Sequence, residues 1–200
     1  MFECKNISIS HGNRKYISAL NIRINSNEVW TISAPSGKGK TTLLKYLAGF
    51  KDDFFNYTGQ LYLDGIDITQ TLPSKRDVAM IFQDDFLFPN MNVLENLNFT
   101  NRCDFINPIN LLEENNLSYL SNKYPNQISG GELSRILLIR LVLLNTSVLL
   151  LDEPFNGLDE DNKRKTINFF LNIFKKYQKK VLVITHVEDE ILDKNKIINL

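Results

Sequence analysis

Residues 29–49 constrain the fold more than any other part of the chain. They contain a short continuous apolar run, Val29–Ser33, then the loop sequence APSGKGKTT at 34–42, then an apolar helix pattern at 43–49. A short continuous apolar run is expected for a strand that is buried on both faces of a parallel sheet. Because a buried strand, a glycine-rich loop and a helix together open a β–α–β unit, this segment predicts an α/β fold.

The loop at 34–42 has the composition of a phosphate-binding P-loop. Its glycines allow the backbone to curl so that N–H groups face phosphate oxygens, and the following helix N-terminus adds a partial positive charge. Lys40 is expected to reach the β- and γ-phosphates, and the Thr41 hydroxyl is expected to coordinate Mg²⁺. The candidate nucleotide-binding residues are Ala34, Pro35, Ser36, Gly37, Lys38, Gly39, Lys40, Thr41 and Thr42. Ala34 stands where the usual P-loop has its opening glycine. Alanine is tolerated there unless the position needs a positive φ or a very close backbone approach.

Three other short apolar runs, at 78–82, 148–151 and 181–185, have the same character as Val29–Ser33. Between the last two, apolar residues recur at helical spacing over 167–177. Acidic residues precede this pattern and lysines follow it, which matches the polarity of a helix dipole. The order strand, helix, strand favours a mainly parallel core sheet.

The start of the chain has a different pattern. Apolar residues alternate along 2–9 and again along 20–24, and 59–68 reads as a strand with an Asp64-Gly65 turn. Alternation with period two is typical of half-buried antiparallel strands. These segments therefore predict an N-terminal antiparallel β subdomain.

The stretch at about 84–144 has few strand signals and predicts a helical subdomain inserted between two core strands. The last residues, 196–200, read as one more short strand. We therefore predict a single domain over 1–200 with the fold of a P-loop NTPase.

The apolar run 148–151 ends in two acids, Asp152 and Glu153. Charge at the tip of a buried strand is costly unless it is paired or bound to a cation. Asp152 fits the acid that holds Mg²⁺, and Glu153 fits the general base that polarises an attacking water. His186 follows the run 181–185 and is a candidate to touch a γ-phosphate or position that water. By itself His186 would be interpreted as a hydrogen-bonded surface histidine. Its position in the sequence after Glu153 favours the catalytic interpretation.

Composition excludes several other classes. The chain has 23 basic and 23 acidic residues and no net charge, which argues against a nucleic-acid binder. Cys4 and Cys103 lie far apart without a CxxC spacing, so neither a disulfide framework nor a zinc site is predicted. No apolar run approaches the roughly 20 residues that a spanning helix needs, so a membrane role would require a partner chain.

The sequence ISGGE at 128–132, which opens an apolar helix pattern at 133–144, makes the chain resemble the ABC ATPases, whose signature reads LSGGQ or a close variant. The resemblance covers essentially the whole chain, and the motifs keep the family's order and spacing. Gln83 matches the Q-loop, 156–159 (NGLD) the D-loop and His186 the switch histidine, while His11 falls where the family carries its adenine-stacking aromatic.

The resemblance implies ATP and Mg²⁺ as cofactors and a second phosphate cradle. In the family, residues matching Ser129, Gly130 and Gly131 face the γ-phosphate held by a second copy, so two ATP molecules lie between two head-to-tail domains. The same resemblance implies nucleotide contacts for His11, Glu132 and Asp159, a metal set of Thr41, Gln83 and Asp152, and a catalytic set of Glu153, His186 and Gln83. Glu132 replaces the usual glutamine and brings negative charge near a phosphate, with modest effects expected. His11 is smaller than the usual tyrosine, so weaker adenine stacking and simple solvent exposure both stay open.

The segment 82–97 and the pair Tyr124-Pro125 resemble the ATPases of binding-protein-dependent importers, which dock a helix of a membrane permease near 83–97. Phe86, Leu87, Phe88 and Met91 are candidates for that groove or for the core of the helical subdomain. Only 46 residues separate Gln83 from Ser129, which disfavours the coiled-coil branch that acts on DNA.

The resemblance therefore implies the motor subunit of an ABC transporter, with import as the favoured direction. Such a subunit works as a homodimer on the cytoplasmic face of a permease and binds no nucleic acid. An ATPase driving a non-transport membrane regulator, in cell-wall or division control, and a soluble assembly ATPase are the alternatives. The sequence does not specify the cargo.

Overall fold

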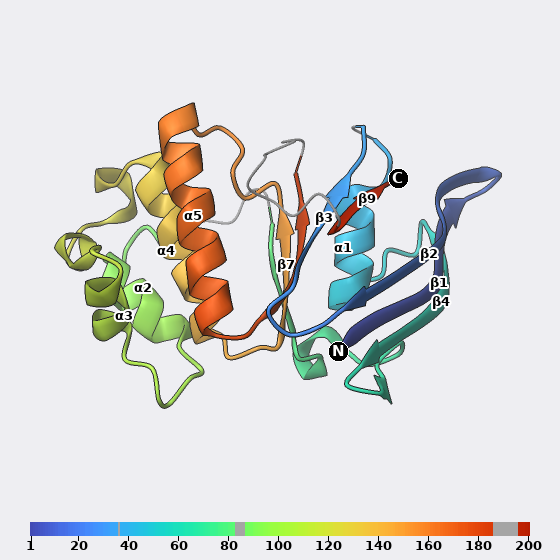
Figure 1. Ribbon diagram of the computed structural model, residues 1–200, viewed down its shortest axis with the longest axis horizontal. Coiled ribbons are helices and arrows are strands. Elements are labelled where there is room, and N and C mark those ends of the chain that lie inside the picture. Colours follow the sequence, from blue (N-terminus) through green and yellow to red (C-terminus); the bar gives the residue numbers. More distant parts are fainter. Residues whose placement is uncertain (36, 83–86, 186–195) are drawn as a thin grey trace.

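The computed structural model describes residues 1–35, 37–82, 87–185 and 196–200, and the account below concerns these residues. Figure 1 shows helices α2 to α5 gathered on one side and an antiparallel sheet on the other, with a second sheet and helix α1 between them. The predicted α/β class, with its antiparallel and helical parts, is confirmed.

The central sheet is parallel and has the strand order β6-β7-β8-β3-β9. All four short apolar runs form its strands, and the last residues add the predicted short strand. The bounds are β3 (Val29–Ser33), β6 (Val78–Ile81), β7 (Val148–Asp152), β8 (Lys180–Ile184) and β9 (Ile197–Asn199). Because the strands are parallel, their carboxyl ends meet at one edge of the sheet, where the predicted acids lie.

Alternate residues of the central strands belong to two different cores. Leu149 and Leu151 pack with the helical side, whereas Val148 and Leu150 pack with α1 and the antiparallel sheet. Every residue of β7 is buried. This burial on both faces explains why the central strands read as continuous apolar runs.

The second sheet is antiparallel, with the order β2-β1-β4-β5. It contains β1 (Phe2–His11), β2 (Arg14–Ile24), β4 (Asn56–Leu63) and β5 (Ile66–Asp67). Asp64 and Gly65 have φ angles of 50° and 84° and form the predicted turn between β4 and β5.

Helix α1 (Lys40–Ala48) lies between the two sheets and is anchored at its carboxyl end by a buried guanidinium. Arg76 is 5% exposed and donates to the carbonyl oxygens of Tyr46 and Leu47 at 3.0 and 2.8 Å. It also donates to the carbonyls of Thr69 and Thr71. Together with the N–H of Gly49, which donates to the Tyr46 carbonyl at 3.0 Å, Arg76 satisfies carbonyl groups at the end of α1.

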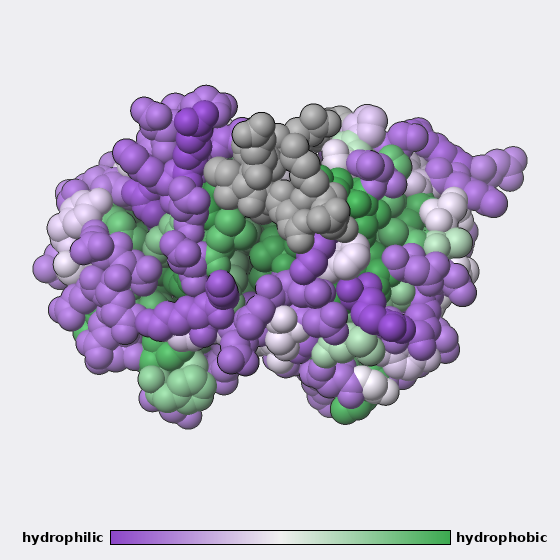
Figure 2. Space-filling view, viewed as in Figure 1, coloured by the Kyte–Doolittle hydropathy of each residue, from purple (hydrophilic) through white to green (hydrophobic). Residues whose placement is uncertain are grey.

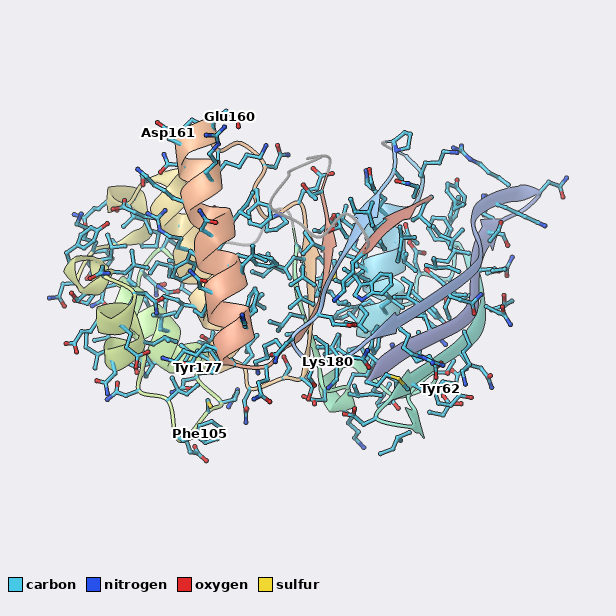
Figure 3. All side chains as sticks on the ribbon, in the orientation of Figure 1. Tyr62, Phe105, Glu160, Asp161, Tyr177 and Lys180 are labelled. Atoms are coloured by element: carbon cyan, nitrogen blue, oxygen red, sulfur yellow. The ribbon has the colours of Figure 1, made fainter. Side chains whose placement is uncertain are left out.

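The helical side is built from four helices, and no strand occurs in the described part of 84–144. The helices are α2 (Val93–Thr100), α3 (Pro108–Glu114), α4 (Gly130–Leu143) and α5 (Glu160–Lys176), with 3₁₀ turns at Ser118–Leu120 and Pro125–Gln127. A third 3₁₀ turn, Pro73–Lys75, lies between β5 and β6. Figure 3 places Glu160 and Asp161 at one end of α5 and Tyr177 at the other, as the predicted charge order requires. In the described ranges, no helix combines the length and apolarity needed to cross a membrane.

On the face seen in Figure 2, hydrophilic residues cover much of the surface, and hydrophobic residues show in a hollow between the helical and sheet sides. The two buried cores lie on opposite faces of the central sheet below that surface.

Candidate nucleotide-binding site

Two glycines of the loop between β3 and α1 have left-handed backbone conformations. Gly37 and Gly39 have φ angles of 77° and 82°, a region that glycine adopts without steric cost. Gly39 is the N-cap of α1, and the first turn of the helix carries no acid. Ala34 is absent from the described residues that have a positive φ. Its departure from glycine therefore adds no strain from a left-handed backbone conformation.

Two residues at the start of α1 point back toward the sheet edge. Lys40 is 7% exposed, and its ammonium donates to the Ala34 carbonyl at 2.6 Å. The Thr41 hydroxyl donates to Asp152 Oδ2, also at 2.6 Å. The structure thus brings together a hydroxyl and a carboxylate that lie 111 residues apart, as the sequence predicts for a shared metal site.

Asp152 is 3% exposed at the end of β7. Burial raises the pKa of this carboxyl above its ordinary value, while the hydrogen bond from Thr41 opposes the shift. A buried carboxyl with a raised pKa gains most from a cation placed beside it.

A cavity of about 340 Å³ lies over the loop and is lined both by P-loop residues and by Glu153, the predicted general base. Its walls are formed by Tyr16, Gly37, Gly39, Lys40, Thr41, Thr42 and Glu153. Glu153 follows β7 directly, so the parallel register of the sheet delivers its carboxylate to the phosphate loop.

Glu153 has an unusual backbone conformation. Its φ is 50°, which is uncommon for a residue with a side chain. The conformation is held because its N–H donates to the Ile184 carbonyl at 2.9 Å, and Asn156 Nδ2 donates to its Oε2 at 3.3 Å. Strained residues of this kind concentrate at functional sites.

Tyr16 is a wall of this cavity that the sequence analysis missed. A Cβ added to Gly39 would lie only 3.0 Å from Tyr16 Cβ, so β2 passes very close to the P-loop. Tyr16 is one residue of an alternating strand, and nothing in that local pattern distinguishes it from its neighbours.

His11 is exposed, which is one of the two environments expected for it. Its imidazole stacks on Phe54 with ring centroids 3.6 Å apart, and it is not among the described residues that line the cavity. The adenine-stacking role of His11 stays a prediction.

The predicted second cradle lies at the start of α4. Ser129 is its N-cap, and Ser129 and Gly130 are exposed, whereas Gly131 is buried. A Cβ on Gly131 would lie 2.9 Å from Asn162 Oδ1, so the glycine allows α5 to approach α4.

Asp159 holds that asparagine in place. Its two carboxylate oxygens accept from the N–H and Nδ2 of Asn162 at 2.9 and 2.7 Å, and these hydrogen bonds lower the pKa of Asp159. Asp159 thus caps α5 and positions Asn162 against the glycine of the second cradle. Asn162 is a second residue that the sequence analysis missed.

Glu132 is turned into the second cradle. Its Oε2 accepts from the N–H and the hydroxyl of Ser129 at 2.7 and 2.8 Å, and its Oε1 accepts from the Tyr119 hydroxyl at 2.7 Å. These bonds, that of the Ser129 N–H foremost, lower the pKa of Glu132 to about 2. The spacing Ser129-x-x-Glu132 is that of a capping box and is readable in the sequence, whereas the Tyr119 contact has no local signal.

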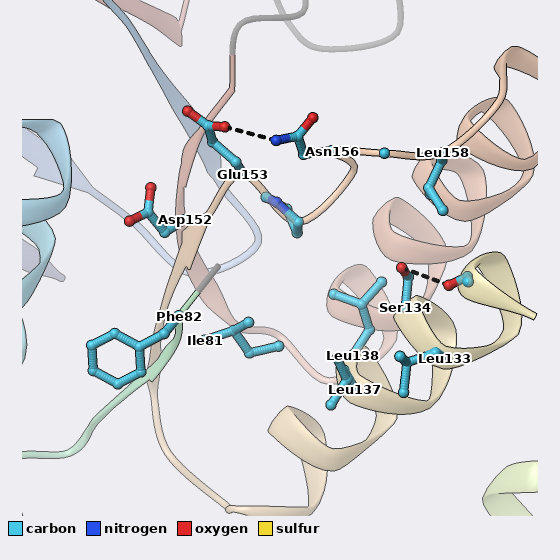
Figure 4. A pocket seen from close by; sticks show the side chains of 13 residues that line it. Ile81, Phe82, Leu133, Ser134, Leu137, Leu138, Asp152, Glu153, Asn156 and Leu158 are labelled. Carbon is cyan, nitrogen blue, oxygen red and sulfur yellow. Dashed lines mark hydrogen bonds between the residues drawn. The ribbon is translucent and has the colours of Figure 1, made fainter. Parts of the chain in front are cut away.

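A cavity of about 350 Å³ connects the acids to the start of α4 (Figure 4). In the close-up, Asp152 and Glu153 lie on one side and Leu133, Leu137 and Leu138 of α4 on the other. The two predicted acids and the first turn of α4 therefore line a common cavity.

Four site predictions cannot be placed. Ser36, Gln83, Phe86 and His186 lie outside the described residues. Of the other candidates for permease docking, Leu87 is 3% exposed and belongs to the core, whereas Phe88 is 42% exposed and contacts Phe99.

Residues 17–156 match the ABC transporter family. The chain belongs to the ABC transporter family. It is 32% identical over 199 residues to the spermidine/putrescine import ATP-binding protein PotA of Nitrosomonas eutropha, and 31% identical over 202 residues to the sulfate/thiosulfate import ATP-binding protein CysA of Rhodopseudomonas palustris. Both alignments include 96% of this chain but only 54% and 57% of the relatives, so the chain spans about half of their length.

Solved structures of this family have the same fold. A dimeric bacterial ABC transporter cassette superposes with a TM-score of 0.73 at 25% identity, with 100% of this chain and 94% of that chain covered. The ADP conformation of another ABC transporter cassette superposes with a TM-score of 0.83 at 24% identity and covers 100% and 87% of the two chains.

Proposed function

We propose that this protein is the ATP-binding and ATP-hydrolysing motor subunit of an ABC membrane transporter that works in import. The observation that carries the proposal is the meeting of Lys40, Thr41 and Glu153 around one cavity, with Asp152 hydrogen-bonded to Thr41. A P-loop with a buried acid and a second acid at the sheet edge has the parts that phosphoryl transfer to water requires.

The first cradle supports binding of a triphosphate. Loop N–H groups and the positive end of α1 attract phosphate oxygens, and Lys40 adds a formal charge. The Tyr16 ring forms a wall against which the rest of the nucleotide would lie.

The Thr41 hydroxyl and the Asp152 carboxylate fit a magnesium site. Both are hard oxygen donors, of the kind Mg²⁺ prefers, and their 2.6 Å contact places them on one side of the cavity. The ion would neutralise charge on the phosphate oxygens when bound. Gln83, which is outside the described residues, stays a proposed third member of this set.

Glu153 is suited to act as the general base. Its carboxylate would accept a proton from the attacking water as the water oxygen bonds to the γ-phosphorus and the bond to the bridging oxygen breaks. A base of this kind accelerates proton transfer by about 10²–10⁴. His186 is proposed to assist by touching the γ-phosphate or positioning the water.

The second cradle supports a head-to-tail dimer. Ser129 caps α4 and is exposed, and the next residue, Gly130, lines the same cavity as Glu153. In the proposed dimer each ATP lies between the P-loop of one copy and the Ser129 cradle of the other, and the dimeric cassette relative supports the formation of a dimer.

A permease is the proposed membrane partner, docked near 83–97 on the cytoplasmic face. Exposed Phe88 supports this surface, and fully buried Asn96 shapes it by accepting from the Phe88 N–H and donating to the Phe88 and Met91 carbonyls. Because relatives at similar identity are named for polyamine and for sulfate import, we infer that the cargo is chosen by other chains.

The decisive experiment is Glu153→Gln. We expect ATP turnover to fall by about 10²-fold or more, because the general base is lost, while ATP binding persists and an ATP-bound dimer accumulates. Steady-state phosphate release and sedimentation velocity measure the two effects. The matched control is Glu160→Gln, which changes an exposed acid at the start of α5. Undiminished turnover in Glu153→Gln would remove the role assigned to this residue.

A further inference from the structure

The Ser129 donors of the second cradle are already engaged within the chain. The Ser129 N–H and hydroxyl both donate to one oxygen of Glu132, at 2.7 and 2.8 Å. The other oxygen of the carboxylate accepts from Tyr119 at 2.7 Å. Both oxygens of Glu132 are thereby fixed over the first turn of α4.

An arriving phosphate would meet this carboxylate. A helix N-terminus attracts an anion through unpaired N–H groups and a partial positive charge. Glu132 supplies an internal anion that satisfies the same end of the helix and repels a second negative group. The N–H and hydroxyl of Ser129 therefore have to release the Glu132 carboxylate before they can donate to a phosphate.

We infer that Glu132, held by Tyr119, is a positioning residue that weakens the grip of the Ser129 cradle on phosphate and so limits ATP-driven dimer formation. The inference rests on the proposed head-to-tail dimer and adds a device that sets how readily it closes. Each dimer contains two such cradles, so the carboxylate weakens dimer formation at two ATP sites.

The structure contains a matched capping box that separates this role from simple helix capping. On α2, the Asn92 N–H donates to Glu95 Oε2 at 2.7 Å, and the Glu95 N–H donates to Asn92 Oδ1 at 2.8 Å. Both boxes place a glutamate at the third position of a helix, but the one on α2 caps a different helix and contains no residue of the signature sequence. Glutamine also forms capping boxes, so a Glu→Gln change removes charge from either box while keeping its hydrogen-bonding shape.

The test compares Glu132→Gln and Glu95→Gln, each in the Glu153→Gln background, where bound ATP is retained. Sedimentation velocity at saturating Mg·ATP gives the dimer dissociation constant of the parent and of both double variants. We expect Glu132→Gln to tighten the dimer by about tenfold or more, because a negative charge leaves each phosphate site, and Glu95→Gln to leave it unchanged. The difference in dimer dissociation constant between the parent and the Glu132→Gln variant should become smaller as the salt concentration is raised, since salt screens charge and leaves packing largely unaffected.

An unchanged or weaker dimer in Glu132→Gln would overturn the inference and leave the proposed function standing. Equal tightening by Glu95→Gln would also overturn it, because the effect would then be a general loss of acidic charge. If neither the parent nor the Glu132→Gln variant forms an ATP-dependent dimer, the proposed head-to-tail arrangement is wrong and the inference falls with it.

Discussion

The two predicted phosphate cradles of this chain both lie at a helix N-terminus, yet the charges in their first turns differ in sign. The cradle at α1 begins with Gly39, which has no side chain to cap the helix, and continues with Lys40. The cradle at α4 begins with Ser129 and is capped by the carboxylate of Glu132. A glycine-rich turn before a helix therefore does not by itself indicate how well a phosphate would bind. The first turn of α1 contains a lysine, whereas the first turn of α4 contains a glutamate.

Their glycines are also glycines for different reasons. Gly37 has a φ of 77°, and a Cβ added to it would meet open space. Gly131 has no positive φ, but its Cβ would collide with Asn162. Gly37 of the first cradle is needed for backbone shape, and Gly131 of the second is needed for helix packing.

The largest expected effect is on the charge of the first cradle. Lys40→Ala should weaken ATP binding by roughly 10- to 100-fold, since charged hydrogen bonds contribute about 1.5–3 kcal/mol. Isothermal titration with a slowly hydrolysed ATP analogue measures this change. Lys38→Ala, at an exposed position of the same loop, should weaken binding by no more than about fivefold. Unchanged affinity in Lys40→Ala would mean that the P-loop assignment is wrong.

The next effect concerns packing at the second cradle. Gly131→Ala should lower the free energy of unfolding by roughly 1–3 kcal/mol, because the methyl group overpacks against Asn162. Gly130→Ala is the control, since its Cβ would meet Leu158 at an ordinary 3.8 Å. Thermal unfolding compares the two, and Asn162→Ala should rescue much of the loss in Gly131→Ala. Equal stability of the two single variants would show that Asn162 does not restrict this position.

The smallest effect is a pH dependence at Glu132. Its pKa is lowered from 4.5 to about 2, so its stabilising contribution is fully present above about pH 4.5 and is lost as the pH falls toward 2. Glu132→Gln should therefore be less stable than the wild type near neutral pH, with a difference that shrinks over that acidic range. Unfolding midpoints measured at several pH values test this, and a difference independent of pH would contradict it.

The sequence predicted the parts of the site that are carried by local pattern. Continuous apolar runs located the central strands, and the loop at 34–42 located the first cradle. The order of Asp152 after a buried strand was enough to place it beside Thr41, because parallel strands end at a common edge.

The residues that were missed act across distant segments. Tyr16 reaches Gly39 from another strand, Asn162 reaches Gly131 from another helix, and Tyr119 reaches Glu132 from a 3₁₀ turn. A tyrosine or an asparagine in such a position has no distinctive local spacing. Only the packing of α4, α5 and β2 against the loops reveals what these side chains touch.

The presence of two separate cradles on one chain has a consequence for inheritance. In the proposed dimer the two cradles of a given chain serve different ATP molecules. A cell with one allele defective in Lys40 and another defective in Ser129 would assemble mixed dimers with one doubly damaged site and one intact site. Two alleles that each abolish function alone would then complement each other in part, whereas two alleles damaged in the same cradle would not.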